Sequence, residues 1–360
     1  MKTYSEAGVD IDKKDVFLKA LLASIKYKRK GFRNVIGIGH YTSLIDMGKY
    51  YLAINTDGVG TKMIIAEEMK KYINVGIDVL AMNVNDTICV GAEPIAFVDY
   101  LVIRDYDLTK ARQIGIGLNR GARMANVNIV GGETAVMPDM LNYTDLSGTS
   151  IGIVKKGKQI TGNKIRKGDI IYAIASSGLH SNGFTLVRKL LKEKNISYET
   201  KLKGRKLGDI LLTSTYIYVK PVIEIANKNY AHGLAHITGG GLRNLIRLKK
   251  MKFVINKPLK APMIFEYIRE LGNIEYKEMY QTFNMGMGFM IITSDKNVDK
   301  VDKIVKKYGF YGDVVGYVDE GFGVEIPEYK IRYESYWNPK FYNLFLKFLF
   351  EEFQFRLLRN

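Results

Sequence analysis

The sequence has one cysteine, few prolines and no long apolar segment. Cys89 is the single cysteine among 360 residues, so an intrachain disulfide is impossible and a reducing compartment is expected. Only 7 prolines accompany 35 glycines, which indicates many tight turns and no low-complexity linker. The N-terminus lacks the apolar core of a secretion signal, and no run approaches the roughly 18 apolar residues of a membrane-spanning helix. We therefore expect a cytoplasmic protein without a membrane partner.

Acidic residues are scarce relative to basic ones. The chain has 37 Asp and Glu against 54 Lys and Arg, a formal net charge of +17. Such an excess suggests nucleic acid as a partner. However, the lysines are spread along the chain, and no zinc-ligand cluster, RNP-like aromatic motif or basic zipper accompanies them. We therefore expect no nucleic-acid partner, and either attraction of phosphorylated small molecules or simply a Lys-rich composition accounts for the charge.

Apolar runs alternate with amphipathic ones, which is typical of a mixed α/β (α+β) chain. We expect strands at 50–54, 95–103, 127–130, 150–154, 170–175, 253–255, 288–293 and 313–318. We expect helices at 76–90, 109–125, 183–193, 215–228, 261–271 and 298–308. Thr109 stands where an N-cap is expected, and Gly309 where a C-cap glycine is expected.

The polar stretch from Lys155 to Asp169 is the best domain boundary, because nothing in it is expected to join a core. This predicts an N-terminal α/β domain over 1–160 and a C-terminal α/β domain over 161–329. Residues 330–360 shift to an aromatic-rich amphipathic pattern that holds the only tryptophan, Trp337. We interpret this last segment as an extension.

The stretch INTDGVGTK combines an acid, two glycines, two threonines and a lysine after an expected strand. Gly58 and Gly60 allow positive φ angles and a close approach of the backbone to a ligand. Asp57 is suited to hold a metal ion, and Lys62 is suited to neutralise an anion. The P-loop pattern GxxxxGK[ST] is absent, so this loop is a candidate phosphate site of another kind.

Three polar side chains interrupt the apolar segment NVGIDVLAMNVNDTICVGAEP. Asp78, Asn85 and Asp86 stand at i, i+7 and i+8 and share one narrow stripe of a helix. The stripe either faces solvent or, together with Asp57, forms a Mg²⁺ site with oxygen ligands. Glu133 follows an expected strand in NIVGGETAVMP, where it is either a third metal ligand or a cap for the next turn.

Two loops carry histidines. In IASSGLHSNGF, His180 lies among serines and an asparagine, and it is a candidate general acid or base. A lone histidine is more often a structural hydrogen-bonding group, and that alternative stays open. In AHITGGGLRNLIRL, His236 and three glycines precede an expected amphipathic helix, whose first N–H groups are suited to bind a phosphate. The triple glycine is otherwise a plain flexible turn.

Nine motifs occur in order along the chain: YSEAGVDID, TDGVGTK, GIDVLAMNVND, GAEPIAF, VGGETA, SSGLHSNGF, YVKPV, AHITGGG and EMYQTFNMGMG. Together they resemble the phosphoribosylformylglycinamidine cyclo-ligase family, also called aminoimidazole ribonucleotide synthetases, from about Tyr4 to about Val318. The resemblance implies two α/β domains of the aminoimidazole ribonucleotide synthetase-like superfamily, whose N-terminal domains pair through their sheets in a homodimer. It also implies ATP-dependent ring closure in purine biosynthesis: formylglycinamidine ribonucleotide becomes aminoimidazole ribonucleotide, with release of ADP and phosphate.

The same resemblance implies roles for residues of this sequence, with ATP and metal bound by the N-terminal domain. Catalysis is expected of His180, His236, Lys62 and Glu133. ATP binding is expected of Asp57, Gly58, Gly60, Thr61, Lys62 and Asp86. Substrate binding is expected of Ser177, Asn182, Thr238, Gly239, Gly240 and Gly241. A Mg²⁺ ion is expected on Asp57, Asp86 and Glu133.

The sequence departs from the family pattern at three places. Val136 stands in GGETAVMPD where the family often has an acid. A lysine of the family's N-terminal segment aligns near Leu22, so either Lys19 or Lys26 substitutes for it or its role is lost. The aromatic extension after about Tyr329 has no counterpart.

Other functions share parts of this pattern. Selenophosphate synthetase, thiamine-monophosphate kinase and the large subunit of formylglycinamidine synthetase have a similar ATP site. The first usually needs a reactive Cys near its N-terminus, whereas Cys89 lies deep in an apolar run; the last is commonly much longer. A non-catalytic protein that binds nucleotides or nucleic acid fits the +17 charge but leaves Asp57, Asp86 and Glu133 without a role.

Overall fold

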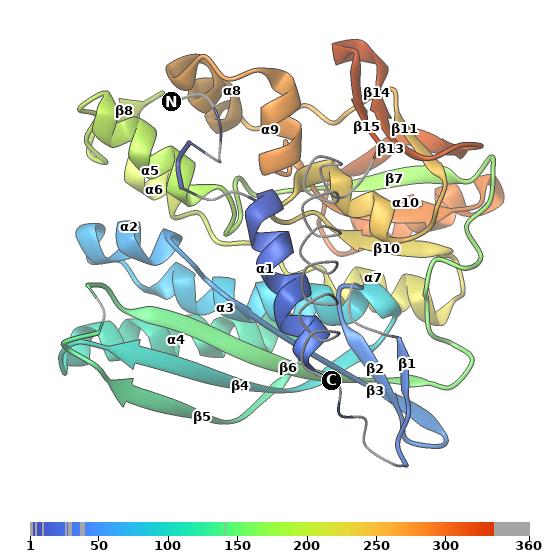
Figure 1. The fold of residues 1–360 in the computed structure, drawn as a ribbon, viewed down its shortest axis with the longest axis horizontal. Coiled ribbons are helices and arrows are strands. Elements are labelled where there is room, and N and C mark those ends of the chain that lie inside the picture. The colour runs from blue at the N-terminus through green and yellow to red at the C-terminus, as the bar shows by residue number, and fades with distance from the viewer. Residues whose placement is uncertain are drawn as a thin grey trace, which may run out of the picture.

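Two β-sheets with helices packed between and around them make up the molecule (Figure 1). The structure is a computed structural model that describes residues 3, 6–8, 11–25, 27, 31–36, 40–140 and 142–334. The motif YSEAGVDID therefore lies partly outside the described residues. Lys26, the side chain of Lys19 and residues 335–360, with Trp337, lie wholly outside them.

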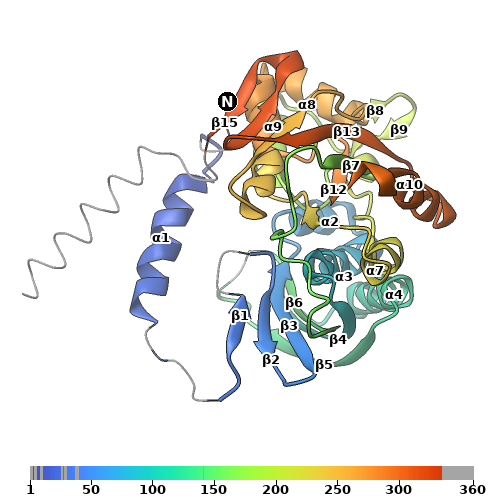
Figure 2. The same cartoon turned by 90° about the vertical axis from the view of Figure 1, so that its right-hand side faces the viewer.

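The first sheet has six strands in the order β1-β2-β3-β6-β4-β5, all antiparallel except the pair β4 and β5. The strands are β1 (Asn34–Ile36), β2 (Ser43–Asp46), β3 (Tyr50–Gly58), β4 (Glu93–Ile103), β5 (Asn128–Val136) and β6 (Asp145–Lys155). Helices α2 (Lys62–Met69), α3 (Ile73–Thr87) and α4 (Leu108–Ala125) lie between this sheet and the second half of the chain (Figure 1). Helix α1 (Ile11–Ser24) lies to one side of both sheets (Figure 2).

The other face of the first sheet, the outer face, carries no helix among the described residues (Figures 1 and 2). Burial alternates along β6, as expected for a sheet that is packed on one side only. The register of β3, β6 and β4 brings apolar side chains together on the outer face: Tyr50, Leu52, Ile54, Val98, Tyr100, Ile151 and Ile153. The outer face is therefore an apolar surface with no described segment over it.

The second sheet has seven strands in the order β10-β12-β7-β13-β11-β14-β15. They are β7 (Ile170–Ala175), β10 (Gly233–His236), β11 (Lys252–Ile255), β12 (Met287–Thr293), β13 (Gly312–Asp319), β14 (Gly323–Ile326) and β15 (Ile331–Tyr333). The helices of this half are α5 (Phe184–Glu193), α6 (Leu207–Leu211), α7 (Val219–Asn227), α8 (Met263–Gly272), α9 (Tyr276–Thr282) and α10 (Val298–Lys307). The 3₁₀ helices are η1 (Ile88–Val90), η2 (Gly241–Arg247), η3 (Asp295–Asn297) and η4 (Pro327–Tyr329), and β8 (Lys201–Leu202) pairs with β9 (Arg205–Lys206). Every residue of β12 is buried, so the second core forms around this strand.

Helix α3 and η1 form one apolar segment, Ile73–Val90, that is long and apolar enough to cross a membrane. This contradicts the expectation that no such run exists, because the few polar residues in the segment leave its mean hydropathy at 1.2. However, 83% of the segment is buried inside the protein. It is the central helix of the core, packed on α4, β3 and β6.

The expected elements occur with shifted ends. The six expected helices correspond to α3, α4, α5, α7, α8 and α10, and the eight expected strands to β3–β7 and β11–β13. The N-cap of α4 is Asp107 rather than Thr109: its carboxylate accepts hydrogen bonds from the N–H groups of Thr109 and Lys110. Gly309, with φ of 78°, follows α10 as expected. The elements that the patterns did not predict are α1, α2, α6, α9 and the short strands β1, β2, β8–β10, β14 and β15.

Two details of the structure bear on the expected organisation. No helix or strand lies between β6 and β7, but Ile160 and Ile165 of this polar stretch are buried in the main core. The extension expected from residue 330 begins inside the second sheet, because β15 pairs with β14. The second sheet thus continues past Tyr329 to Tyr333.

Candidate active site

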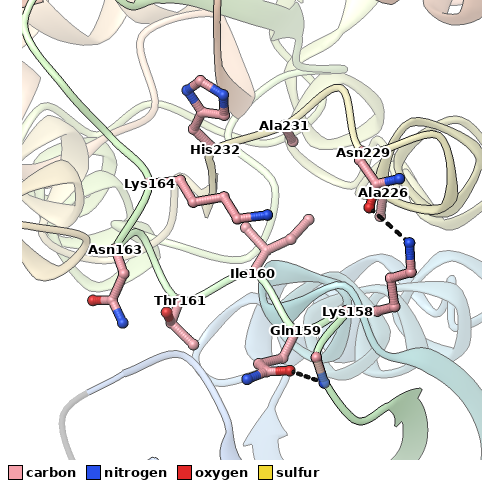
Figure 3. A pocket seen from close by; sticks show the side chains of 11 residues that line it. Lys158, Gln159, Ile160, Thr161, Asn163, Lys164, Ala226, Asn229, Ala231 and His232 are labelled. Atoms are coloured by element: carbon pink, nitrogen blue, oxygen red, sulfur yellow. Dashed lines mark hydrogen bonds between the residues drawn. The ribbon is translucent and has the colours of Figure 1, made fainter.

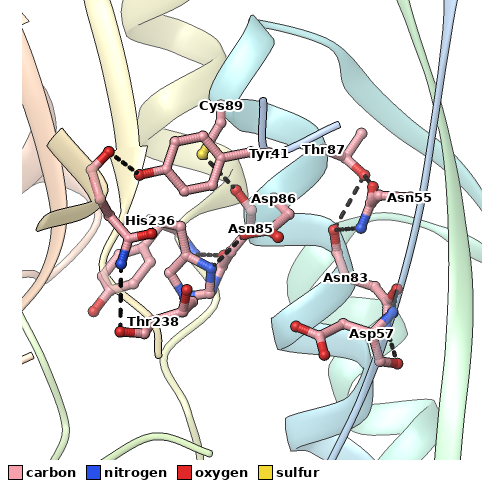
Figure 4. Close-up of polar contacts among 12 residues, drawn as sticks. Tyr41, Asn55, Asp57, Asn83, Asn85, Asp86, Thr87, Cys89, His236 and Thr238 are labelled. Carbon is pink, nitrogen blue, oxygen red and sulfur yellow. Dashed lines mark hydrogen bonds and ion pairs between the residues drawn. The ribbon is translucent and has the colours of Figure 1, made fainter. Parts of the chain in front are cut away.

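Asp57 lies at the end of β3, where the side chain of Asn83 on α3 holds its backbone (Figure 4). Asn83 Oδ1 accepts from the Asp57 N–H at 2.9 Å, and Asn83 Nδ2 donates to the Asp57 carbonyl at 3.0 Å. Asp57 Oδ1 accepts from the Gly58 N–H at 2.8 Å. Asn83 was not among the expected site residues, although an asparagine three residues before Asp86 in an apolar helix was a usable signal.

Asp78 and Asn85 of the polar stripe of α3 are buried against residues 212–218, so they do not face solvent, whereas Asp86 is 17% exposed. Five hydrogen bonds of 2.7–2.9 Å join α3 to this segment. Asn74 donates to the Leu212 carbonyl, and Asp78 accepts from the N–H and the hydroxyl of Thr215. Asn85 donates to the Tyr216 carbonyl and accepts from the Tyr218 N–H. Residues 212–218 belong to no β-strand, and side chains of α3 form hydrogen bonds with their backbone groups instead. The stripe therefore joins the two halves of the chain, and Asp78 is not a metal ligand.

Lys62, the first residue of α2, is fully buried. Its Nζ donates to the carbonyls of His180 at 3.1 Å and Thr213 at 2.8 Å, and lies 2.7 Å from Asp78 Oδ2. Burial lowers the pKa of Lys62 and raises the pKa of Asp78, and the opposite charge of each partner limits the shift. The expected contact between Lys62 and a phosphate is not compatible with this arrangement, because the ammonium is enclosed by protein groups.

His236, the last residue of β10, pairs with Asp86 of α3 (Figure 4). His236 Nδ1 lies 2.8 Å from Asp86 Oδ1, and the side chain of Asp86 is 17% exposed while that of His236 is fully buried. An ionised carboxylate only accepts, so this contact assigns a ring proton to Nδ1. His236 Nε2 has no hydrogen-bond partner within the described chain. Asp86 thus orients a histidine whose other ring nitrogen is buried without a protein partner among the described residues.

His180 lies in the loop after β7 with φ of 60°, a left-handed conformation that is uncommon for a residue with a side chain. It is fully buried, and neither ring nitrogen has a partner in the part of the chain that the structure describes. Its ring centroid lies 6.3 Å from that of His236. Burial, and next the neighbouring His236 and Lys62, lowers the pKa of His180 well below its ordinary value. His180 is therefore neutral near pH 7 and suited to accept a proton.

Tyr218 and Gly288 complete this cluster, and neither was expected. The Tyr218 hydroxyl donates to the Ala175 carbonyl at 2.8 Å, and its ring lies 6.2 Å from that of His180. A Cβ on Gly288 of β12 would lie 2.0 Å from the Tyr218 hydroxyl oxygen and 2.6 Å from His180 Cε1. Only glycine fits here. The motifs YVKPV and NMGMG contain both residues and were the available signal.

The glycine loop after His236 lies beside the His180 loop. A Cβ on Gly239 would lie 3.2 Å from Asn182 Oδ1, and Asn182 Nδ2 is buried without a partner among the described residues. Gly240 and Gly241 have φ of 102° and 54°. The expected amphipathic α-helix is instead η2, a 3₁₀ helix of 7 residues. The Thr238 carbonyl accepts from the Gly241 N–H at 2.9 Å, which closes the turn.

The remaining expected residues lie near the same junction. The Ser177 hydroxyl donates to the Ser214 carbonyl at 2.6 Å. The Thr61 hydroxyl lies 3.0 Å from the Thr185 hydroxyl of the second half. The space in front of Gly60, where a Cβ would stand, is open.

Glu133 lies on the outer face of the first sheet, away from Asp57. Across the sheet Asp57 pairs with Gly148, Gly148 with Asp99, and Asp99 with Gly132, so this row faces one side. Glu133 is one residue further along β5, and successive residues of a strand face opposite sides. The expected metal site of Asp57, Asp86 and Glu133 is therefore not assembled. Among the described residues, no three His, Cys, Asp or Glu side chains form a metal-binding group.

A separate polar cavity of about 180 Å³ lies between residues 157–164 and the end of α7 (Figure 3). Lys158 and Lys164 extend along it, and Lys158 Nζ donates to Asn229 Oδ1 at 3.2 Å. None of the expected site residues lines this cavity. The candidate active site is therefore the junction of β3, α3 and the loops after β7 and β10.

The chain matches the family AIR synthase related protein in two parts: the N-terminal domain over residues 39–154 and the C-terminal domain over residues 166–327. It is similar to the phosphoribosylformylglycinamidine cyclo-ligase of Thermoplasma volcanium, with 45% identity over 94% of this chain and 100% of the relative. It is 48% identical to that of Methanocaldococcus jannaschii over 90% of this chain and 94% of the relative.

Solved structures share the fold. The thiamine-monophosphate kinase of Stenotrophomonas maltophilia superposes with a TM-score of 0.61 at 15% identity, over 88% of this chain and 96% of that chain. Thermotoga maritima PurL complexed with ADP superposes with a TM-score of 0.58 at 15% identity, over 83% of this chain and 46% of that chain. At such identities the likeness concerns the fold alone.

Proposed function

This chain belongs to the AIR synthase family of phosphoribosylformylglycinamidine cyclo-ligases, and from that premise we propose how its residues carry out the reaction. The enzyme converts formylglycinamidine ribonucleotide and ATP into aminoimidazole ribonucleotide, ADP and phosphate in purine biosynthesis. The observation that supports the site best is the pair of buried histidines, His180 and His236, whose ring nitrogens His180 Nδ1, His180 Nε2 and His236 Nε2 lack hydrogen-bond partners among the described residues. Buried polar atoms without partners are rare in native proteins, and a bound substrate would supply the missing partners.

Ring closure needs an activated oxygen and a base. The formamide oxygen of the substrate attacks the γ-phosphorus of ATP, so that an O–P bond forms and the bond to ADP breaks. The amidine nitrogen then attacks the formyl carbon, phosphate leaves with the oxygen, and the nitrogen loses a proton. We assign that proton to His180, which burial keeps neutral, while Asp86 orients His236 toward the same space. Both reacting groups belong to one molecule, so positioning supplies much of the rate.

The nucleotide phosphates are proposed to lie over the loop from Gly58 to Thr61. The loop ends at the start of α2, whose N-terminus favours an anion, and the space in front of Gly60 is open. Lys62 is not among the residues that we propose to bind the phosphates, because its ammonium is enclosed by protein groups. We propose that Ser177, Asn182 and residues 238–241 bind the substrate. Asn182 Nδ2, which is buried without a partner among the described residues, is the proposed hydrogen-bond donor to it.

A Mg²⁺ ion fits the carboxylates near this loop. Mg²⁺ typically takes one or two protein carboxylates and completes its shell with water and substrate phosphates. Asp86 contacts His236 through Oδ1 and its side chain is 17% exposed, and Asp57 stands at the strand end beside the loop. We therefore propose Asp57 and Asp86, without Glu133, as the residues that hold Mg²⁺. When bound, the ion neutralises charge on the transferring phosphoryl group.

We propose that two copies of the chain pair through the outer face of the first sheet. This face is apolar, and Tyr50 and Tyr100 on it are 47% and 40% exposed. Exposed apolar patches of this extent are typical of interaction sites. In such a homodimer Glu133 lies at the subunit interface. Light scattering of the parent at micromolar concentration should give the dimer mass, and Tyr100→Asp should give the monomer; a parent that is monomeric throughout contradicts the proposal.

The remaining assignments follow from the same premise. We propose an ATP- and metal-binding domain over 1–160, a second domain over 161–329 and an extension over 330–360 whose first residues complete the second sheet. We propose a cytoplasmic location, and a small-molecule substrate with neither nucleic acid nor membrane as a partner, since the apolar helix α3 is buried and the basic residues are dispersed.

The function is tested by substrate-dependent ATP use. The purified enzyme should hydrolyse ATP appreciably only with formylglycinamidine ribonucleotide, and release about one phosphate per imidazole, because the phosphoryl acceptor is the substrate. Thiamine phosphate and selenide should give no turnover. His180→Ala should slow ring closure by about 10²–10⁴-fold with nucleotide binding kept. ATP consumption with either alternative acceptor but not with the ribonucleotide contradicts the proposal.

A further inference from the structure

Lys62 is a buried cation that links three segments. Its ammonium contacts Asp78 on α3, the Thr213 carbonyl before α7 and the His180 carbonyl in the loop after β7. The Lys62 and Asp78 side chains are both 0% exposed. The Lys62 ammonium also lies over the ring of Phe184, with Nζ 5.6 Å from the ring centroid. One side chain of the first half of the chain thus fixes two backbone positions of the second half.

Stability alone does not explain this pair. Removing two charges from water costs about as much as their attraction returns, and replacing a buried ion pair by neutral groups is often neutral or stabilising. A role in specifying one local geometry is the better explanation. The local geometry concerned is that of His180, whose carbonyl oxygen is one of the two acceptors.

The His180 backbone needs such a restraint. Its φ of 60° is an unfavourable backbone conformation for a residue other than glycine, so neighbouring contacts must hold it. Two further bonds brace the same loop: Asn284 Nδ2 donates to the Gly178 carbonyl at 2.9 Å, and the Ser177 hydroxyl donates to the Ser214 carbonyl. Only Lys62 bonds His180 itself among the described residues. The ring of His180 has no hydrogen bond to set its direction, so the backbone sets it.

We propose that Lys62 is a positioning residue: by holding the His180 carbonyl from the first half of the chain, it aims the His180 ring at the substrate beside His236. The proposal rests on the proposed role of His180 in proton transfer. Lys62 acts through His180 and touches neither nucleotide nor substrate. Its loss should therefore lower kcat and leave the KM for ATP almost unchanged, because misplacing a catalytic group by about 1 Å costs on the order of 10²-fold in rate.

The test uses the double variant Lys62→Met/Asp78→Asn. Methionine fills a similar volume without a donor, and asparagine still accepts from Thr215, so no buried charge is left alone. We expect kcat to fall by about 10²-fold and the KM for ATP to change less than about threefold. If this variant does not fold, Lys62→Gln/Asp78→Asn replaces it; glutamine is one atom too short to reach both carbonyls, and the same result is expected.

A second buried pair supplies the matched control. Lys110 of α4 lies 2.9 Å from Glu67 of α2, with side chains only 7% and 21% exposed, and contacts none of the loops near His180. Lys110→Met/Glu67→Gln removes an ion pair of the same type from the same half of the chain. We expect its kcat to stay within about twofold of the parent, since only the pair that bonds His180 affects catalysis.

The decisive measurement repeats the Lys62→Met/Asp78→Asn change in a His180→Ala background. If Lys62 acts through His180, the change should lower kcat no further, because residues that work as a unit are not additive. An equal loss of rate in both backgrounds overturns the inference, as does a double variant with normal kcat while His180→Ala alone is slow. A His180→Ala enzyme with normal kcat instead contradicts the proposed function of His180, so the two failures are distinguishable.

Discussion

Replacing Gly288 with alanine tests the tight packing around His180. The added Cβ would lie 2.0 Å from the Tyr218 hydroxyl oxygen and 2.6 Å from His180 Cε1, and real contacts below 3.0 Å are essentially never seen. Both neighbours are fully buried, and the Tyr218 hydroxyl is fixed by its bond to the Ala175 carbonyl. Because both contacts are below 3.0 Å, at least one of the two rings must move.

The size of the effect follows from this contact. An extra methyl group in a packed core costs about 1–3 kcal/mol. Each kcal/mol lowers Tm by about 2–4 °C for units of this size, so we expect a decrease of roughly 2–12 °C. A displaced His180 ring should also lower kcat by about 10²-fold. Thermal unfolding and substrate-dependent ADP release measure the two effects on the same preparation.

Gly115→Ala is the matched control for this change. Gly115 lies within α4, and no atom stands within 4 Å of the position of an added Cβ. Alanine in a helix is about 0.5–1 kcal/mol more stable than glycine, so Tm should rise slightly and kcat should not change. A Gly288→Ala enzyme with the kcat and Tm of the parent would refute the packing argument.

Three further predictions concern the metal, the pH dependence and the chain end. Asp57→Asn and Asp86→Asn should each abolish ATP turnover with little change in Tm, because an amide keeps the size but not the charge that Mg²⁺ requires; normal turnover in either variant refutes the metal assignment. Burial, with the Arg247 charge as a smaller cause, lowers the pKa of His40 from 6.5 to about 4. Between these pKa values the unfolded chain binds a proton that the folded chain does not. The free energy of unfolding, measured with urea, should therefore fall by about 3 kcal/mol as pH falls from about 6.5 to about 4, and His40→Gln should reduce this fall. A free energy of unfolding that does not fall on acidification contradicts this. Truncation after Glu334 should spare ATP turnover, whereas truncation after Tyr329 should also lower Tm because it removes β15; loss of turnover in a folded Glu334 truncation would place the tail in the active site.

Periodicity predicted the fold class and the long elements, because one buried face imposes a regular spacing on each of them. The helix predicted over residues 76–90 corresponds to α3, which is also a helix and covers nearly the same residues. Short edge strands such as β15 were missed, since three residues carry too little pattern. The N-cap of α4 was placed two residues late because Thr109 and Asp107 are both good caps, and only the hydrogen bonds distinguish them.

The candidate site was predicted as a set of residues but not as an arrangement. Motif order located His180, His236, Asp57 and Asp86, and the structure adds the pairing of His236 with Asp86. The side of the sheet on which Glu133 lies depends on the strand register, because a shift of one residue moves every side chain of a strand to the opposite side. The burial of Lys62 depends on loops that follow it by more than a hundred residues along the chain, so local sequence contains no sign of it.

The bonds between α3 and residues 212–218 have a consequence for synthesis on the ribosome. Asp78 is translated about 137 residues before its partner Thr215, which corresponds to roughly 7–27 s at about 5–20 residues per second. During that interval Asp78 and Asn85 of this unusually apolar helix lack their backbone partners in the second half, and Lys62 has Asp78 but neither of its carbonyl acceptors. We therefore expect the first half of the polypeptide, expressed alone, to be insoluble.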